Sequence, residues 1–204
     1  SSEDEKDLTF VEASKRGIMG LRNLGNTCFM NSGIQCVTSI NELTEYFLSG
    51  KYLNEINYTN NIGTKGELSK AYGKLIQKLW YGSDSSVSPS VLKQAIGKFQ
   101  PMFLGYDQHD SGELISYLLD GLHEDLNRVK NKPYTEAKDY DGRPDEVLAR
   151  ESWDLFLLRN QSIVVDLMYG QFKSRLDCPK CSKISVTFDP FLMLPVPIPQ
   201  NNTK

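Results

Sequence analysis

The residue whose surroundings most favour chemistry in this sequence is Cys28. It follows a polar, glycine-containing turn, Asn23–Thr27, and precedes an apolar run from Phe29 to Val37 that predicts a helix. The unpaired N–H groups and partial positive charge at a helix N-terminus stabilise a thiolate, the nucleophilic form of cysteine. Cys28 is therefore a candidate nucleophile, and a buried structural cysteine is the alternative.

Asn23 lies five residues before Cys28, at the start of the turn. A cysteine that attacks a carbonyl needs hydrogen-bond donors for the oxyanion. The Asn23 side-chain amide and the Cys28 backbone N–H could be directed at one point, which is the geometry of an oxyanion hole. Alternatively, Asn23 is a turn residue whose side chain binds its own backbone.

A cysteine nucleophile also needs a base, and the sequence contains only two histidines. His123 lies inside a predicted helix, next to the apolar Leu122, where a satisfied helix-surface or half-buried histidine is expected. His109 stands among polar residues at the start of that helix, where capping or hydrogen bonding is favoured over general-base catalysis. We therefore expect the base to lie outside this chain.

Cys178-Pro-Lys-Cys181 has the spacing of half a zinc site. Two thiolates three residues apart can reach one tetrahedral ion at about 2.3 Å each, but a structural zinc site takes four ligands. A redox Cys-x-x-Cys is an alternative, although such pairs occur at the start of a helix and this pair lies between predicted strands. A turn without metal is the remaining possibility.

Composition limits the class of protein. The chain has 204 residues, 39% of them hydrophobic and 24% charged, as in ordinary globular domains. A net charge of −3 without a basic stripe argues against a nucleic-acid partner. No apolar stretch could span a bilayer, no signal-peptide pattern is present, and four cysteines do not resemble a secreted disulfide framework. We expect a cytoplasmic or nuclear protein without a membrane partner.

The elements that must position these residues are mostly helical up to residue 160. Apolar periodicity predicts helices over Phe29–Val37, Glu42–Leu48, Glu67–Trp80, Pro89 to Gln100 with Ser88 as cap, a long helix capped by Asp110 or Ser111, and Glu146–Asn160. The long helix has a continuous apolar stripe of Ile115, Leu118, Leu119, Leu122 and Leu126. In the last helix Val147, Leu148, Trp153 and Leu157 are expected on the buried side. Lys51–Gly66, Gly82–Ser88 and Lys130–Pro144 have loop composition.

From Ser162 the pattern changes to β-branched and aromatic residues. Ser162–Asp177 and Lys183–Leu194 predict two strands that form a hairpin with the Cys178–Cys181 turn at its tip. The whole is an α+β chain: a flexible acidic leader over residues 1–15, a helical part over 16–160, and the first strands of a β part over 161–204.

Three segments resemble the signature boxes of the ubiquitin-specific proteases, which are papain-like deubiquitinases. Gly20–Cys36 is similar to their cysteine box. Gly105–Leu114, followed by the helix segment Leu118–Asn127, is similar to their second box, with His109, Ser111 and Gly112 departing from the usual residues. Phe172–Phe191 is similar to their first zinc knuckle, most closely in the subgroup with an insert in the catalytic domain.

The resemblance implies a papain-like fold, with a helical thumb and the first strands of the fingers, and assigns roles by position. Cys28 would be the nucleophile that attacks the carbonyl of the C-terminal glycine of ubiquitin, and Asn23 would supply the oxyanion-hole side chain. Gln108 and Asp110 would line the channel for the ubiquitin tail, and an acidic Asp110 suits a tail that carries arginines.

The resemblance also implies what must come from elsewhere. Cys178 and Cys181 would be the first ligand pair of a four-cysteine zinc site, which makes zinc the expected cofactor. The catalytic histidine of the family and its Asp/Asn partner follow the second knuckle, beyond Lys204. The expected partners are ubiquitin, ubiquitinated proteins and a C-terminal half of the same catalytic domain. The alternatives are a non-catalytic ubiquitin-binding or scaffold module and a zinc-ribbon module that binds a protein partner.

Overall fold

The computed structural model describes residues 17, 19–136 and 140–197, and the leader predicted over residues 1–15 lies outside them. The chain divides into two units. The first runs to Asn131 and includes Asn160–Leu167, and the second comprises Lys132–Arg159 with the chain from Met168 onward. The predicted nucleophile therefore belongs to the first unit and the predicted metal ligands belong to the second.

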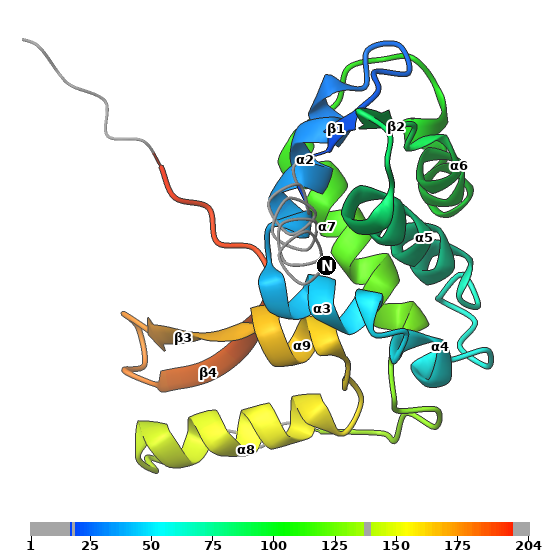
Figure 1. Ribbon diagram of the computed structural model, residues 1–204. Helices are drawn as coiled ribbons and strands as arrows, with labels where there is room; N and C mark the ends of the chain where they lie inside the picture. Colours follow the sequence, from blue (N-terminus) through cyan, green and yellow to red (C-terminus); the bar gives the residue numbers. More distant parts are fainter. Residues whose placement is uncertain (1–16, 18, 137–139, 198–204) are drawn as a thin grey trace, which may run out of the picture. The chain divides into compact units, whose positions relative to one another are not determined.

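The first unit is built from helices (Figure 1). Its elements are β1 (Gly20–Leu21), α2 (Cys28–Thr38), α3 (Asn41–Leu48), α4 (Tyr52–Glu55), α5 (Glu67–Tyr81), β2 (Ser86–Val87), α6 (Ser90–Phe99), the 3-10 helix η1 (Pro101–Leu104), α7 (Ser111–Asp125) and α9 (Ile163–Met168), which ends at the boundary. The helices predicted over 29–37, 42–48 and 67–80 are confirmed to within one residue at each end. No helix of the described residues has both the length and the apolar composition needed to cross a bilayer.

α7 organises the core of the first unit, where it packs against α2, α5 and α6. Its predicted apolar stripe is confirmed: Leu118, Leu119, Leu122 and Leu126 are each no more than 4% exposed, and Ile115 is half-buried. Burying a side chain of this size stabilises a fold by about 1.5–3 kcal/mol, so this stripe is a major source of stability.

The helices α4 and α6 differ from the sequence prediction. α4 lies within the segment expected to be a loop, and its Tyr52 is buried with its ring 4.8 Å from that of Phe47. This aromatic contact fixes a single helical turn that the polar local sequence does not predict. α6 begins at Ser90 with Pro89 as its N-cap, one residue later than predicted, because the Lys93 N–H donates to the Pro89 carbonyl.

The strands β1 and β2 form a parallel pair of two residues each, with Gly20 opposite Ser86 and Leu21 opposite Val87. Beyond the pair, the Arg22 N–H donates to the Val87 carbonyl at 2.9 Å. A pair this short has no periodicity to detect, and the sequence prediction missed it. It holds the segment before Asn23 against the segment that leads into α6.

The expectation of a strand from Ser162 is wrong for its first part, because Ile163–Met168 is the helix α9. Val164 and Val165 are adjacent and both are buried, at 0% and 2% exposed. A strand would direct adjacent side chains to opposite faces, whereas a helix lets both contact the core. Ser162 begins this helix, since its Oγ accepts from the Val165 N–H at 3.3 Å.

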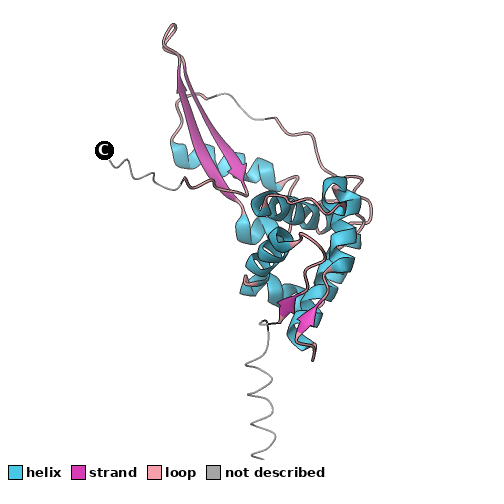
Figure 2. Cartoon of the chain, turned by 90° about the horizontal axis from the view of Figure 1, so that it is seen from above, coloured by secondary structure: helices cyan, strands magenta, loops and turns pink. Residues whose placement is uncertain are grey.

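The second unit contains α8 (Asp145–Leu157) and an antiparallel hairpin of β3 (Gly170–Asp177) and β4 (Ile184–Phe191). The two strands form the long ribbon in Figure 2. Their register pairs Gly170 with Phe191 at one end and Asp177 with Ile184 at the other, and the rings of Phe172 and Phe191 stack at 3.9 Å. The Cys178–Cys181 turn lies at the tip, so the predicted hairpin is confirmed.

α8 packs against β4 and β3 of its own unit. It ends at Leu157, three residues before the predicted end. Leu148 is buried as expected, but the expected burial of Val147 is wrong, because this side chain is 43% exposed. Against this two-stranded hairpin α8 buries a narrow stripe that includes Leu148 and leaves the neighbouring position exposed.

Candidate active site

The turn before Cys28 is organised by the side chain of Asn23. Asn23 Oδ1 accepts hydrogen bonds from the Gly25 N–H at 2.9 Å, the Thr27 N–H at 3.2 Å and the Thr27 hydroxyl at 3.1 Å. Gly25 and Asn26 have φ values of +95° and +53°, a conformation that glycine adopts freely and that asparagine tolerates. Asn23 is thus a turn residue bonded to its own backbone, as one sequence interpretation expected.

The same bonds leave the donor end of Asn23 available. Its carbonyl oxygen serves the turn, while its Nδ2 forms no hydrogen bond with any described residue. The side chain is exposed and held in one orientation by its three acceptor contacts. A fixed amide donor with no protein partner is what an oxyanion hole requires, so the two interpretations of Asn23 are compatible.

The N-terminus of α2 is open at Cys28. Thr27 is the N-cap residue, but its side chain accepts no hydrogen bond from the helix. Its hydroxyl instead bonds Asn23 Oδ1 and accepts from the Leu24 N–H at 2.9 Å, which keeps Thr27 only 2% exposed. The Cys28 N–H has no hydrogen-bond partner among the described residues and remains a donor beside the exposed thiol.

The loop before α7 brings Gln108 to the thiol. The Cys28 Sγ–H donates to Gln108 Oε1 at 3.6 Å, across 80 residues of sequence. Two predicted site residues therefore meet. Asp110, also in this loop, caps α7 by accepting from the Glu113 N–H at 2.9 Å, as predicted, and it remains exposed. Its carboxylate bonds the start of α7 and not the Cys28 thiol.

α2 and α7 approach each other closely next to this loop. The Ser111 hydroxyl donates to the Phe29 carbonyl at 2.9 Å. At Gly33 a Cβ would come within 3.1 Å of the Ile115 side chain, so glycine permits the short distance between the helices. The first turns of both helices are thus joined directly behind Cys28 and Gln108. Ser111, a departure from the usual box residue, supplies that bond.

The family of the chain follows from comparison with known proteins. The family model described as ubiquitin carboxyl-terminal hydrolase matches residues 19–194. The chain belongs to this family. It is 54% identical over 188 residues to ubiquitin carboxyl-terminal hydrolase 15 of Homo sapiens, covering 92% of this chain and 19% of that protein. It is 51% identical over 202 residues to the putative ubiquitin carboxyl-terminal hydrolase 11 of Arabidopsis thaliana, covering 99% of this chain and 22% of that protein. The chain thus spans about a fifth of the length of these relatives.

A solved structure gives the fold independently. The chain matches a structure of the SAGA DUB module, Ubp8/Sgf11/Sus1/Sgf73, bound to monoubiquitin, with a TM-score of 0.60, at 22% identity, over 88% of this chain and 35% of that chain. The predicted α+β fold of the ubiquitin-specific protease type is confirmed. The division into a thumb that carries Cys28 and Gln108 and fingers that begin with the hairpin stays a prediction.

Neither histidine of this hydrolase-family chain is hydrogen-bonded to Cys28 in the structure. His109 packs edge-on against the rings of Phe29 and Phe103, at 5.3 and 5.1 Å between centroids, and its Nε2 is buried with no hydrogen-bond partner among the described residues. His123 is 3% exposed, with Nδ1 at 2.8 Å from Ser162 Oγ and Nε2 at 3.2 Å from Asn160 Oδ1. His123 is therefore satisfied as expected, but in the core and not on the helix surface.

Two polar residues of α2 hold the segment that leads into the Asn23–Thr27 turn, and the sequence did not predict this role. Asn31 Nδ2 donates to the carbonyls of Leu21 and Arg22 at 3.3 and 3.2 Å, and Gln35 Nε2 donates to the Met19 carbonyl at 3.2 Å. The available signal was their spacing, since polar residues four apart share one face of a helix. They bind the segment that leads into Asn23 to the helix that carries Cys28.

The Cys178–Cys181 turn is arranged around the Cys178 sulfur. The Cys178 N–H donates to the Lys183 carbonyl and the Ser182 N–H donates to the Cys178 carbonyl, each at 3.0 Å. The backbone N–H groups of Cys181 and Lys180 hold the pKa of the Cys178 thiol below its ordinary value. Within the described ranges no third His, Cys, Asp or Glu joins the pair as a potential ligand. The turn thus has the donor set of half a zinc site.

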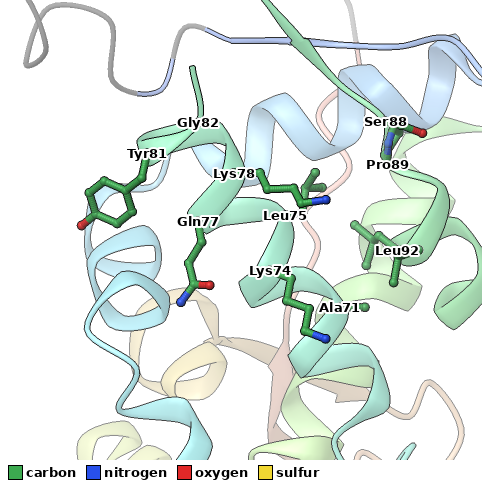
Figure 3. Close-up of a pocket in the computed structure, with 11 residues that line it drawn as sticks. Ala71, Lys74, Leu75, Gln77, Lys78, Tyr81, Gly82, Ser88, Pro89 and Leu92 are labelled. Carbon is green, nitrogen blue, oxygen red and sulfur yellow. The ribbon is translucent and has the colours of Figure 1, made fainter. Parts of the chain in front are cut away.

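A separate pocket of about 330 Å³ lies on α5 and the start of α6. Figure 3 shows Lys74, Leu75 and Lys78 on α5 and Leu92 on α6 among the side chains that line it. None of the predicted site residues lines this pocket. The candidate active site is instead an exposed surface constellation of Cys28, Asn23 and Gln108.

Proposed function

We propose that this chain carries the nucleophile of a thiol-dependent ubiquitin hydrolase that cleaves the bond after the C-terminal glycine of ubiquitin. The observation that supports it best is the joint geometry at Cys28: an exposed thiol at an uncapped helix N-terminus, 3.6 Å from Gln108 Oε1 and adjacent to the Asn23 turn. The family membership indicates which reaction this geometry serves.

In the proposed mechanism, Cys28 Sγ, deprotonated by the base, forms a bond to the glycine carbonyl carbon, and the carbonyl π electrons move to oxygen. Asn23 Nδ2–H and the Cys28 N–H donate to that oxyanion. The C–N bond then breaks, and the leaving amine takes a proton from the histidine of the C-terminal half. Water, deprotonated by the same histidine, attacks the thioester and releases the ubiquitin carboxylate and the free thiol.

Gln108 and Asp110 complete the proposed substrate contacts. Gln108 adjoins the nucleophile, and the exposed Asp110 carboxylate has its Oδ1 engaged by the α7 N-terminus, which leaves Oδ2 for an arginine of the ubiquitin tail. The partners we propose are ubiquitin, ubiquitinated proteins and the C-terminal half of the same catalytic domain, in the cytoplasm or nucleus.

Zinc is the proposed structural cofactor, held by Cys178 and Cys181 together with a second cysteine pair from the C-terminal half. A bound zinc ion would supply rigidity to the tip of the hairpin and no chemistry at Cys28. Within this chain, the contribution of Cys178 and Cys181 is a thiol pair already placed on one tight turn.

The test uses ubiquitin with a C-terminal cysteine-reactive group and ubiquitin with a C-terminal fluorogenic amide. We expect the chain, supplied with the C-terminal half, to be labelled at Cys28 and to release the fluorophore, and Cys28→Ala to do neither. Cys36→Ser is the matched control, because Cys36 is also exposed on the same helix. Ubiquitin binding without labelling would contradict the hydrolase and favour the non-catalytic binding module.

A further inference from the structure

The loop that carries Gln108 is tied to the Asn23–Thr27 turn by Tyr106. Asn26 Nδ2 donates to the Tyr106 carbonyl at 3.0 Å. The Tyr106 ring lies over Gly25 so closely that a Cβ at position 25 would come within 3.0 Å of Tyr106 Cδ1. Gly25 and Asn26 are the two positive-φ residues of the turn, so Tyr106 contacts its most constrained part.

α6 holds Tyr106 from the other side. Lys93 Nζ donates to the Gly105 carbonyl at 2.7 Å and lies 4.9 Å from the centroid of the Tyr106 ring, within cation–π distance. The preceding residue, Leu92, is 1% exposed, and Figure 3 shows its side chain on the pocket side of α6. The helix that presents Lys93 is therefore anchored in the core.

Burial does not explain the aromatic ring at this position. Tyr106 is 71% exposed, and its phenol forms no hydrogen bond with the described residues. The ring lies close to Gly25 and under the Lys93 ammonium. Gly25 in turn donates its N–H to Asn23 Oδ1. A continuous set of contacts thus runs from Lys93 through Tyr106 and Gly25 to Asn23.

We infer that Tyr106 is a positioning residue of the active site. Its ring and carbonyl clamp Gly25 and Asn26 and thereby fix the direction of the Asn23 amide and of the Cys28 N–H. Because the clamp joins the Asn23–Thr27 turn to the Gln108 loop, it fixes the positions of Asn23 and Gln108, which flank the Cys28 thiol, relative to each other. The kinetic consequence of this inference rests on the proposed function, whereas the clamp itself does not.

The kinetic test compares Tyr106→Ala with Tyr106→Phe in the chain supplied with the C-terminal half, using ubiquitin with a C-terminal coumarin amide. Loss of the ring lets the donors shift, so we expect Tyr106→Ala to lower kcat by about tenfold or more with KM within about threefold. Tyr106→Phe keeps the ring and should stay within about twofold of the parent, since the phenol has no role. Tyr58→Ala is the matched control, because Tyr58 is also exposed and its ring centroid also lies near a lysine, 5.2 Å from Lys70 Nζ, outside the site.

Three kinetic results would overturn the inference. The first is a raised KM with unchanged kcat in Tyr106→Ala, which indicates direct substrate contact. The others are an equal loss of kcat in Tyr106→Ala and Tyr106→Phe, or an equal loss of kcat in Tyr58→Ala.

Amide hydrogen exchange at Gly25 and Thr27, measured in the chain itself, tests the clamp without any activity. We expect faster exchange in Tyr106→Ala and parent rates in Tyr106→Phe. Exchange rates in Tyr106→Ala equal to those of the parent would refute the clamp even if the parent is an active enzyme. If the parent is inactive while exchange is faster in Tyr106→Ala, the proposed function is refuted and the clamp stands.

Discussion

Replacing Asn23 with aspartate separates its structural role in the turn from its proposed role as a donor to the oxyanion. The acceptor oxygen that binds Gly25 and Thr27 is kept, and the Nδ2 donor is lost. Removing one oxyanion donor from a hydrolase costs about 2.7–4 kcal/mol of transition-state stabilisation, or about 100- to 1000-fold in kcat. We expect a loss at the upper end of this range, because the new carboxylate repels the oxyanion.

Asn23→Ala removes the donor and also three acceptor contacts of the turn. Hydrogen bonds of this kind contribute about 0.5–1.5 kcal/mol each to stability. Asn23→Ala should therefore lower both kcat and the free energy of unfolding, whereas Asn23→Asp should lower kcat with little change in stability. This divergence distinguishes a donor to the oxyanion from a purely structural turn residue.

The assay is release of coumarin from the ubiquitin amide by the chain with its C-terminal half, beside urea unfolding of each variant. Asn54→Asp makes the same chemical change at an exposed position of α4 and should leave both measurements unchanged. An Asn23→Asp enzyme within tenfold of the parent kcat would refute the oxyanion role. A large loss of stability in Asn23→Asp would show that the turn depends on the amide and not on its oxygen alone.

Three further predictions concern stability and metal. Asp125→Ala should lower the free energy of unfolding by about 3 kcal/mol in urea titrations, because the buried carboxylate accepts from the Thr64 N–H, the Thr64 hydroxyl and the Ser69 N–H. The exposed control Asp84→Ala should lower it by less than about 0.5 kcal/mol. Equal effects of the two substitutions would refute this account. Ser111→Ala should cost about 1 kcal/mol in the same titration through its lost bond to Phe29, and a neutral result would show that helix packing alone joins α2 to α7. Cys178→Ser should abolish zinc binding, measured by metal analysis of the complex with the C-terminal half. Retained zinc would exclude Cys178 and Cys181 as a ligand pair.

Sequence periodicity predicts the longer helices of the first unit well because each of them extends over two or more turns and has an apolar face. The stripe through Leu118 and Leu122 is visible in the sequence and is the core of the folded unit. Local preference fails where tertiary burial decides. Val164 and Val165 favour a strand by residue type, yet both are accommodated in the core by one turn of helix.

The candidate site was only partly predictable. Cys28 is recognisable from its position between a polar turn and an apolar helix, but its approach to Gln108 spans 80 residues and has no local signal. Gln108 entered the prediction through the resemblance alone. Tyr106 lies within the second resemblance segment, but no role was predicted for it, because its contacts are with a backbone turn and a cation on another element.

The way the site is held explains why it can be exposed and still precise. Three segments meet at Cys28, namely the chain before Asn23, the start of α2 and the loop before α7. Side chains bonded to backbone carbonyls join them: Asn31 to Leu21 and Arg22, Asn26 to Tyr106, and Ser111 to Phe29. Directional bonds of this kind fix positions without requiring the groups to be buried, so the Cys28 thiol and the proposed donors stay exposed. A site built instead on apolar packing would have to bury the thiol that must react.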